Sequence, residues 1–222
     1  MGKLWLNNEI EDRLAMLQQT ELGHPGINQV AIEKDWWVTV TLKALFQTDC
    51  RDSLIFKGGT SLSKGFNIIE RFSEDIDLAI SHSFFSIEKT TKSQREKLRK
   101  MSRTYIHETL STQLDARLKE MGVSGYTIEN VSQVQDKNGE WKPIDSDKDP
   151  TVILIHYQSI LEDTINYIPP RVKIEISCLS MDEPTELLQI RSLIGESFDG
   201  EDADAESLVR TVAPTRTFLE KL

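Results

Sequence analysis

The segment from residue 54 to residue 80 constrains the fold more than any other part of this chain. It predicts a short strand, a glycine pair, a helix and a second strand, at residues 54–56, Gly58-Gly59, 60–69 and 76–80. Glycine lacks a Cβ atom, so its backbone N–H group can approach a ligand closely. The following helix directs its N-terminal N–H groups and its positive dipole end toward the same place. We therefore expect a phosphate-binding turn between strand and helix.

Polar side chains around this turn suit a triphosphate. Ser61 and Ser63 can add hydroxyl donors, and Lys64 can add a cation. The GxxxxGK[ST] spacing of a Walker loop is absent. The residues predicted to bind the nucleotide here are Gly58, Gly59, Thr60, Ser61 and Lys64. Taken alone, two glycines before a helix are typical of an ordinary turn.

Two aspartates on the second predicted strand form a candidate metal site. Asp75 and Asp77 are two residues apart, so both carboxylates project from one face of the strand, while Ile76 faces the core. Carboxylates held side by side repel each other unless a cation lies between them, and oxygen ligands suit Mg²⁺ or Mn²⁺. A pair of this kind is, by itself, also typical of a solvated strand edge.

A later strand offers a third carboxylate. Charged and apolar residues alternate from Arg171 to Ile176, which places Lys173 and Glu175 on one face. Asp75, Asp77 and Glu175 on adjacent strands would make a two-metal site for phosphoryl or nucleotidyl transfer. Lys173 and Lys221 are candidates to stabilise the charge of departing pyrophosphate. Lys173 and Glu175 alone would also fit the wet face of a sheet, but the combination in this order favours catalysis.

The rest of the chain predicts an α+β fold around one mixed or antiparallel sheet flanked by helices. An Asn-Gly hairpin turn lies at residues 138–139. Trp36 and Trp37 lie within a predicted helix, where core packing is favoured over base stacking. We expect one domain, residues 1–222, with an N-terminal helical part, about residues 1–50, packed on the core. The predicted helices are 8–19, 28–46, 88–121, 186–194 and 215–222, and the further strands are 126–134, 140–142, 151–157, 172–179 and 208–212.

Composition excludes several classes of protein. No run of about 18 apolar residues exists, and the N-terminus lacks the apolar segment of a signal peptide, so we expect no membrane span. Two cysteines without partner histidines argue against a zinc site or a disulfide framework, and they favour a cytoplasmic protein. A net charge of −10 makes the chain a poor general binder of nucleic acid.

The charge is unevenly distributed. Residues 88–103 carry seven basic and two acidic side chains, a local charge of +5. This stretch could contact RNA phosphate, or it could be the solvated face of a helix.

The first motif resembles that of the AbiEii/AbiGii-type nucleotidyltransferase toxins, which include the MenT toxins. The similarity lies in Gly58-Gly59-Thr60-Ser61-Leu62-Ser63-Lys64, followed by Arg71-Phe72-Ser73-Glu74-Asp75-Ile76-Asp77. The stretch Ile32 to Val38 is similar to the helix that precedes this motif in the family. Arg171 to Ser177 is similar to its third-carboxylate strand, and Thr217 to Lys221 to the start of a later helix.

The resemblance implies a DNA polymerase β-like nucleotidyltransferase core. It implies an NTP substrate, Mg²⁺, a tRNA 3′ end as a possible acceptor, and an antitoxin partner in a toxin–antitoxin or abortive-infection system. Family chains usually continue into a further helical region, which we expect to be missing here.

Three functions remain open at this stage. The favoured one is metal-dependent transfer of NMP from an NTP to an acceptor. The alternatives are a nucleotide-binding regulatory module without turnover and a protein-interaction domain that binds no nucleotide. A Glu175 carboxylate close enough to Asp77 to share metal ions would favour the enzyme.

Overall fold

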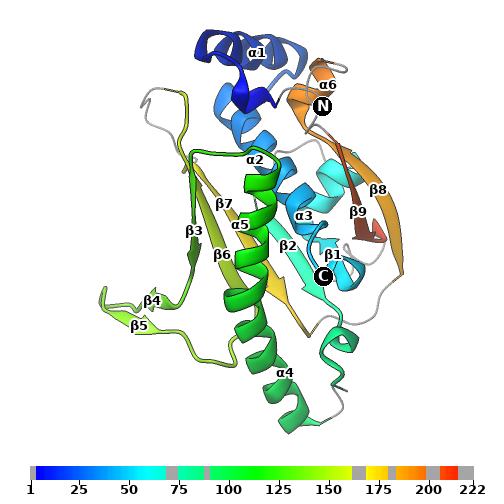
Figure 1. Ribbon diagram of the computed structural model, residues 1–222, viewed down its shortest axis with the longest axis vertical. Coiled ribbons are helices and arrows are strands. Elements are labelled where there is room, and N and C mark those ends of the chain that lie inside the picture. Colours follow the sequence, from blue (N-terminus) through cyan, green and yellow to red (C-terminus); the bar gives the residue numbers. More distant parts are fainter. Residues whose placement is uncertain are drawn as a thin grey trace.

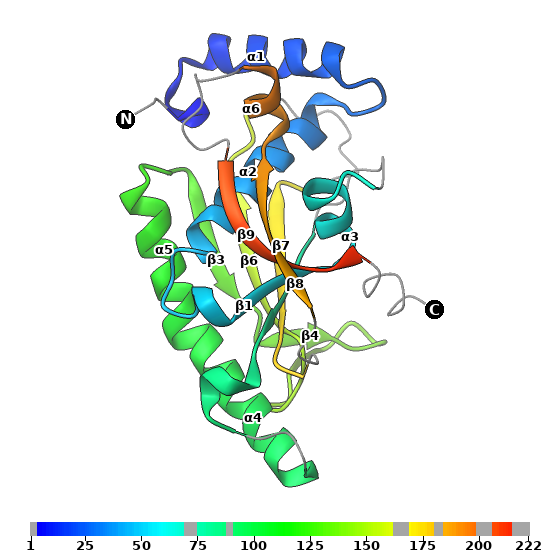
Figure 2. The same cartoon turned by 90° about the vertical axis from the view of Figure 1, so that its right-hand side faces the viewer.

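The computed structural model describes residues 4–68, 75–87, 91–161, 169–179, 184–198 and 206–214. Within them, a seven-stranded mixed sheet in the order β3-β6-β7-β2-β1-β9-β8 forms the centre of the molecule. Helices α2 and α5 pack on the sheet, and α1 lies across one end (Figure 1). A 90° turn shows α4 projecting beyond the opposite end (Figure 2).

The regular elements have the following bounds. The strands are β1 (Leu54–Lys57), β2 (Asp75–Ile80), β3 (Tyr126–Asn130), β4 (Gln133–Gln135), β5 (Trp141–Pro143), β6 (Thr151–Tyr157), β7 (Arg171–Ser177), β8 (Thr185–Arg191) and β9 (Glu206–Val212). The α-helices are α1 (Ile10–Gly23), α2 (Gln29–Leu45), α3 (Gly58–Thr60), α4 (Lys92–Tyr105), α5 (Ser111–Glu120) and α6 (Leu193–Ser197). π-Helical segments at Ser61–Gly65 and Ile106–Leu110 continue α3 and α4, and 3₁₀ turns lie at Trp5–Asn7, Arg51–Ser53 and His82–Phe85.

The sheet register brings distant strands together at its centre. β2 runs antiparallel to β1 and parallel to β7, and β7 in turn pairs with β6. Ile76 and Leu78 of β2, like Ile174 and Ile176 of β7, are fully buried. Because side chains alternate along a strand, the intervening polar residues of both strands point to the opposite face.

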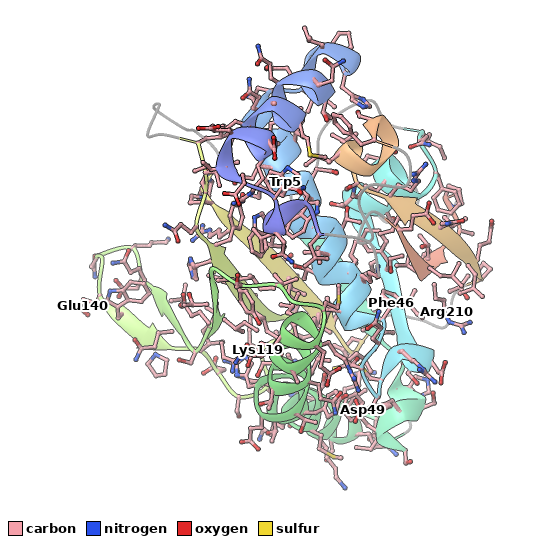
Figure 3. The ribbon with its side chains drawn as sticks, turned by 45° about the horizontal axis from the view of Figure 1, so that its top comes forward. Trp5, Phe46, Asp49, Lys119, Glu140 and Arg210 are labelled. Atoms are coloured by element: carbon pink, nitrogen blue, oxygen red, sulfur yellow. The ribbon has the colours of Figure 1, made fainter. Side chains whose placement is uncertain are left out.

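Helix α2 forms the middle of the core. Asn28 caps its N-terminus by accepting a hydrogen bond from the Ala31 N–H group. Trp36 and Trp37 are each 1% exposed, and Trp37 stacks on Tyr157 with ring centroids 4.8 Å apart. The prediction that both tryptophans pack in the core is therefore confirmed. Trp5, labelled in Figure 3, adds a ring 5.3 Å from Trp36.

Most predicted helices and strands are present, and one prediction is wrong. Residues 186–194, predicted as a helix, form most of β8 and only the start of α6. Their apolar spacing fits a helix, but Thr185–Arg191 pairs with β9 along its whole length as the edge strand of the sheet. The predicted strand at 126–134 is divided, because β3 pairs with β6 whereas β4 forms a separate hairpin with β5.

Two further predictions concern the helix after the glycine turn and the helix at the C-terminus. The predicted helix 60–69 begins at Gly58, two residues earlier, and becomes π-helical from Ser61 to Gly65. The predicted C-terminal helix 215–222 lies outside the described residues. Among the described helices, none combines the length and the hydropathy required to cross a bilayer.

Candidate active site

The glycine turn at the end of β1 lies directly against a predicted metal ligand. Gly58 has a φ of +80°, a conformation that residues with a Cβ atom rarely adopt. A Cβ atom at this position would lie 2.0 Å from Asp77 Oδ2 and 2.8 Å from Asp77 Cβ. Glycine is thus required twice, by the backbone conformation and by the close approach of Asp77.

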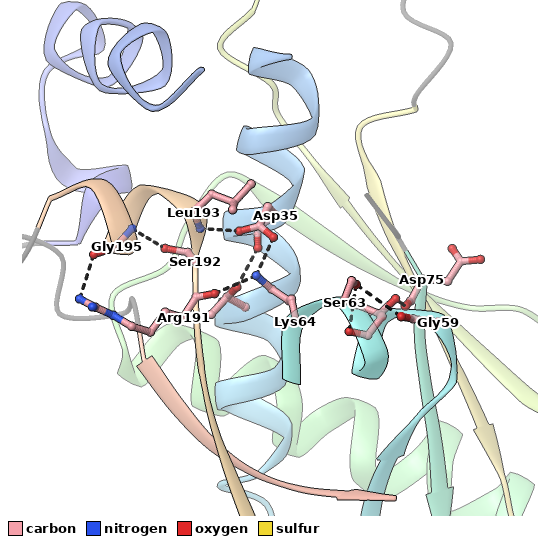
Figure 4. Close-up of polar contacts among 11 residues, drawn as sticks. Asp35, Gly59, Ser63, Lys64, Asp75, Arg191, Ser192, Leu193 and Gly195 are labelled. Atoms are coloured by element: carbon pink, nitrogen blue, oxygen red, sulfur yellow. Dashed lines mark hydrogen bonds and ion pairs between the residues drawn. The ribbon is translucent and has the colours of Figure 1, made fainter. Parts of the chain in front are cut away.

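Hydroxyl groups hold the helical segment that follows the turn. The Ser61 hydroxyl donates to the Gly58 carbonyl at 2.8 Å, and the Thr60 hydroxyl donates to the Asp75 carbonyl. The Ser63 hydroxyl donates to the carbonyls of Gly59 and Thr60 at 3.4 and 3.3 Å (Figure 4). In this structure these hydroxyls stabilise the turn itself. Their role in binding a phosphate stays a prediction.

The three predicted carboxylates share one face of the sheet. In the β2–β7 register Asp75 lies opposite Lys173, and Asp77 lies opposite Glu175. All four side chains are partly exposed, between the buried isoleucines of the same strands. The sequence-based prediction that these residues lie on adjacent strands is confirmed by this pairing; their catalytic role stays a prediction.

Lys57 is a candidate site residue that our sequence analysis did not select. It is the last residue of β1 and lies opposite Asp77 in the antiparallel register. Its ammonium lowers the pKa of Asp77, against the larger effects that raise it. The one sequence signal for Lys57 is its position immediately before the glycine pair.

Electrostatic crowding is concentrated on Asp77. Burial raises the pKa of Asp77 to about 6, with further contributions from the negative charges of Glu175 and Asp75. Lys173 Nζ lies 2.6 Å from Glu175 Oε1, and this hydrogen bond raises the pKa of the Lys173 ammonium. The site thus holds more negative charge than its lysines neutralise, an arrangement that favours a cation.

The donor set fits Mg²⁺ or Mn²⁺, but the ligands do not converge. Carboxylate oxygens are the ligands that these hard cations prefer. Within the described residues, however, no group of three or more His, Cys, Asp or Glu side chains is drawn together closely enough to hold a metal ion. The Glu175 carboxylate is engaged by Lys173, so Glu175 would have to exchange that partner to act as a ligand.

Lys64 does not join the glycine turn as predicted. Its ammonium lies 2.6 Å from Asp35 Oδ1 on α2 and donates to the Arg191 carbonyl at 2.9 Å (Figure 4). The Lys64 and Asp35 side chains are only 9% and 6% exposed. The buried carboxylate holds the cation away from the turn, so a direct phosphate contact by Lys64 is not supported. Lys221 lies outside the described residues.

The raised pKa of Asp77 predicts a pH-dependent stability. The folded state favours the protonated acid. Asp77 therefore makes its full contribution to folding stability below about pH 4, and this contribution is lost as the pH rises through 6. We expect Asp77→Asn to be more stable than wild type by about 1–2 kcal/mol at pH 8, a value reduced for solvent screening. The difference should vanish near pH 4.

Urea unfolding of both proteins at several pH values measures the difference in their free energies of unfolding. All other titrating groups are the same in the two proteins, so the pH dependence of this difference comes from Asp77. Added Mg²⁺ should reduce the stability difference at pH 8, because it stabilises wild type alone. An identical stability difference at pH 4 and pH 8 would contradict the prediction.

The mixed sheet, the glycine turn and the paired aspartates together define a nucleotidyltransferase-type core. The family model described as "Nucleotidyl transferase AbiEii toxin, Type IV TA system" matches residues 41–222. The chain therefore belongs to the AbiEii family of nucleotidyl transferase toxins, as the first motif indicated. A comparison with curated proteins found no match.

Proposed function

We propose that this chain is a metal-dependent nucleotidyltransferase that moves an NMP group from an NTP to an acceptor hydroxyl. The observation that supports this most is the placement of Asp77, which lies against the Gly58 turn and is in register with both Lys57 and Glu175. The glycine turn and the carboxylates of β2 and β7 are thus adjacent, and transfer from a triphosphate requires phosphate-binding groups and metal ligands to lie side by side.

Each residue has a defined role in this proposal. The N–H groups of the Gly58-Gly59 turn bind the β- and γ-phosphates. The acceptor oxygen attacks the α-phosphorus, the bond from the α-phosphorus to the bridging oxygen breaks, and pyrophosphate leaves. Glu175 receives the acceptor proton, while Lys57 and Lys173 stabilise the charge of the departing pyrophosphate. Asp75 and Asp77, with Glu175, would hold Mg²⁺, which when bound neutralises the triphosphate and polarises the α-phosphate.

The family's description as toxins of a type IV toxin–antitoxin system supports a biological setting for this activity. The enzyme acts as a toxin in the cytoplasm, where NTP, Mg²⁺ and RNA are available, and a cognate antitoxin counteracts it. The acceptor is the 3′ end of a tRNA.

The direct test incubates the protein with each labelled NTP, Mg²⁺ and total tRNA. We expect label in RNA with at least one NTP, pyrophosphate release in equal amount, and no product with a chelator. Reactions without RNA reveal any labelling of the protein itself. Absence of pyrophosphate release with every NTP would contradict the proposal.

The Lys173–Glu175 ion pair supports a second candidate, a nucleotide-binding regulatory module without turnover. If this pair persists when nucleotide binds, Glu175 is unavailable to a metal or to an acceptor proton. Calorimetry and a pyrophosphate assay together distinguish the two functions, because the module would bind NTP but release no pyrophosphate.

Exposed basic residues on α4 support the proposed RNA acceptor. Lys92, Arg95, Lys97 and Lys100 are exposed on the helix that projects beyond the sheet (Figure 2). Arg99 and Arg103, by contrast, are partly buried and donate to the carbonyls of Asp147 and Val131. The four exposed residues are therefore the ones to replace.

Changing these four residues to Gln should weaken RNA binding and flatten its salt dependence by about one unit per lost phosphate contact. NTP affinity should stay the same, because the turn lies on other elements. A control variant that changes the exposed Lys119, Lys137, Lys142 and Lys148 to Gln removes equal charge from other elements. Equal RNA affinities for the two variants would show that α4 is a solvated helix only.

A further inference from the structure

The buried ion pair between Lys64 and Asp35 connects three parts of the chain that meet beside the glycine turn. Lys64 belongs to the helical segment that follows the turn, and Asp35 belongs to α2. The Asp35 carboxylate uses both oxygens: Oδ1 lies 2.6 Å from Lys64 Nζ, and Oδ2 accepts from the Leu193 N–H group at 2.8 Å. Lys64 also donates to the Arg191 carbonyl at 2.9 Å, so the pair joins α2 to the junction between β8 and α6 (Figure 4).

We propose that Lys64 and Asp35 are positioning residues, which hold the Gly58-Gly59 turn in the orientation that binds the triphosphate. This inference rests on the proposed function, because the turn is taken as the phosphate-binding element. Neither residue touches the nucleotide in this proposal.

The geometry of residues 58–65 explains why such a tether is needed. The segment begins with a single α-helical turn and continues as a π-helix from Ser61 to Gly65. π-Helical turns are rare and occur often at functional sites. At its N-terminal end the segment is held by Gly58 against Asp77 and by the Thr60 hydroxyl on the Asp75 carbonyl.

The ion pair fixes the C-terminal end of the same segment. With both ends held, the N–H groups of the turn keep one direction relative to the aspartates of β2. If the C-terminal tether were released, the π-helical turn could relax toward α-helical geometry and redirect those N–H groups.

A role in positioning accounts for this pair better than a role in stability. Two buried charges contribute little net stability, because desolvation offsets their attraction. Their fixed geometry, however, specifies one arrangement of the elements they join. Here those elements are α2, the turn segment and the β8–α6 junction, two of which are far from the turn in sequence.

The test compares a double variant with each single variant and with a control. Asp35→Asn and Lys64→Met each leave one charge buried without its partner and should lower stability. The double variant Asp35→Asn/Lys64→Met removes both charges and should recover much of the wild-type thermal stability. Glu33→Gln is the matched control. It changes a fully buried acid on α2 whose partners, Ser159 and the Ile160 N–H group, lie away from the turn.

The positioning role predicts that activity does not recover with stability. Below its unfolding temperature, the double variant should bind NTP more weakly than wild type, by on the order of 100-fold, and KM should rise more than kcat falls. Hydrogen exchange of the peptide covering residues 58–65 should be faster than in wild type, while the strands of the sheet exchange as before. Glu33→Gln should match wild type in NTP affinity and in exchange of this peptide.

Each outcome decides between the proposals. A stable double variant with wild-type NTP affinity and exchange would overturn the positioning role and leave the proposed function intact. NTP binding without transfer by wild type would overturn the transferase activity, while the affinities of the variants still test the positioning role. If wild type bound no NTP, both proposals would fall.

Discussion

Asp77→Asn is expected to lower Mg²⁺-dependent transfer by on the order of 10³-fold. The change removes one negative charge from the only carboxylate of the described site that contacts the glycine turn and also faces Glu175. A neutral amide holds a divalent cation far more weakly than a carboxylate does. The measurement is pyrophosphate release with the NTP that wild type uses, at saturating Mg²⁺.

The stability of this variant separates chemistry from folding. Because burial and the neighbouring carboxylates raise the pKa of Asp77, the amide should stabilise the fold at pH 8 while activity is lost. Asp52→Asn is the matched control, since Asp52 is highly exposed and lies outside the site. Transfer by Asp77→Asn at the wild-type rate would exclude Asp77 as a metal ligand.

Gly58→Ala is expected to weaken NTP binding by on the order of 100-fold and to destabilise the fold. The added methyl carbon would lie 2.0 Å from Asp77 Oδ2, so either the turn or the carboxylate must move. The φ of +80° adds about 1–2 kcal/mol of backbone strain for a residue with a Cβ atom. Calorimetry with NTP and thermal unfolding measure the two consequences separately.

Gly139→Ala separates backbone strain from the clash. Gly139 has a φ of +82°, nearly the same as Gly58, but nothing lies within 4 Å of its missing Cβ atom. It should therefore show the strain without loss of NTP affinity. If Gly58→Ala and Gly139→Ala bound NTP with the same affinity, the close approach of the turn to Asp77 would not contribute to NTP binding.

Local patterns were sufficient to predict much of the fold and part of the site. The 3.6-residue apolar period of α2 predicts a buried helix, and the alternation in β2 and β7 predicts which residues face the core. The same alternation placed Asp75, Asp77, Lys173 and Glu175 on open strand faces. These features depend on residues a few positions apart, so the sequence alone was enough to determine them.

The partners of each side chain were decided by tertiary structure. Lys57 is opposite Asp77 because of the β1–β2 register, which no local pattern specifies. Lys64 looked like a phosphate ligand in the sequence, yet its ammonium lies against Asp35 and the Arg191 carbonyl, 29 and 127 residues away. The local apolar spacing of β8 predicted part of a helix, but the segment forms a strand because its pairing with β9 outweighs that spacing. Long-range pairing and burial choose among partners that local periodicity leaves equivalent, and in this chain they place the Lys64 ammonium against the buried Asp35 carboxylate.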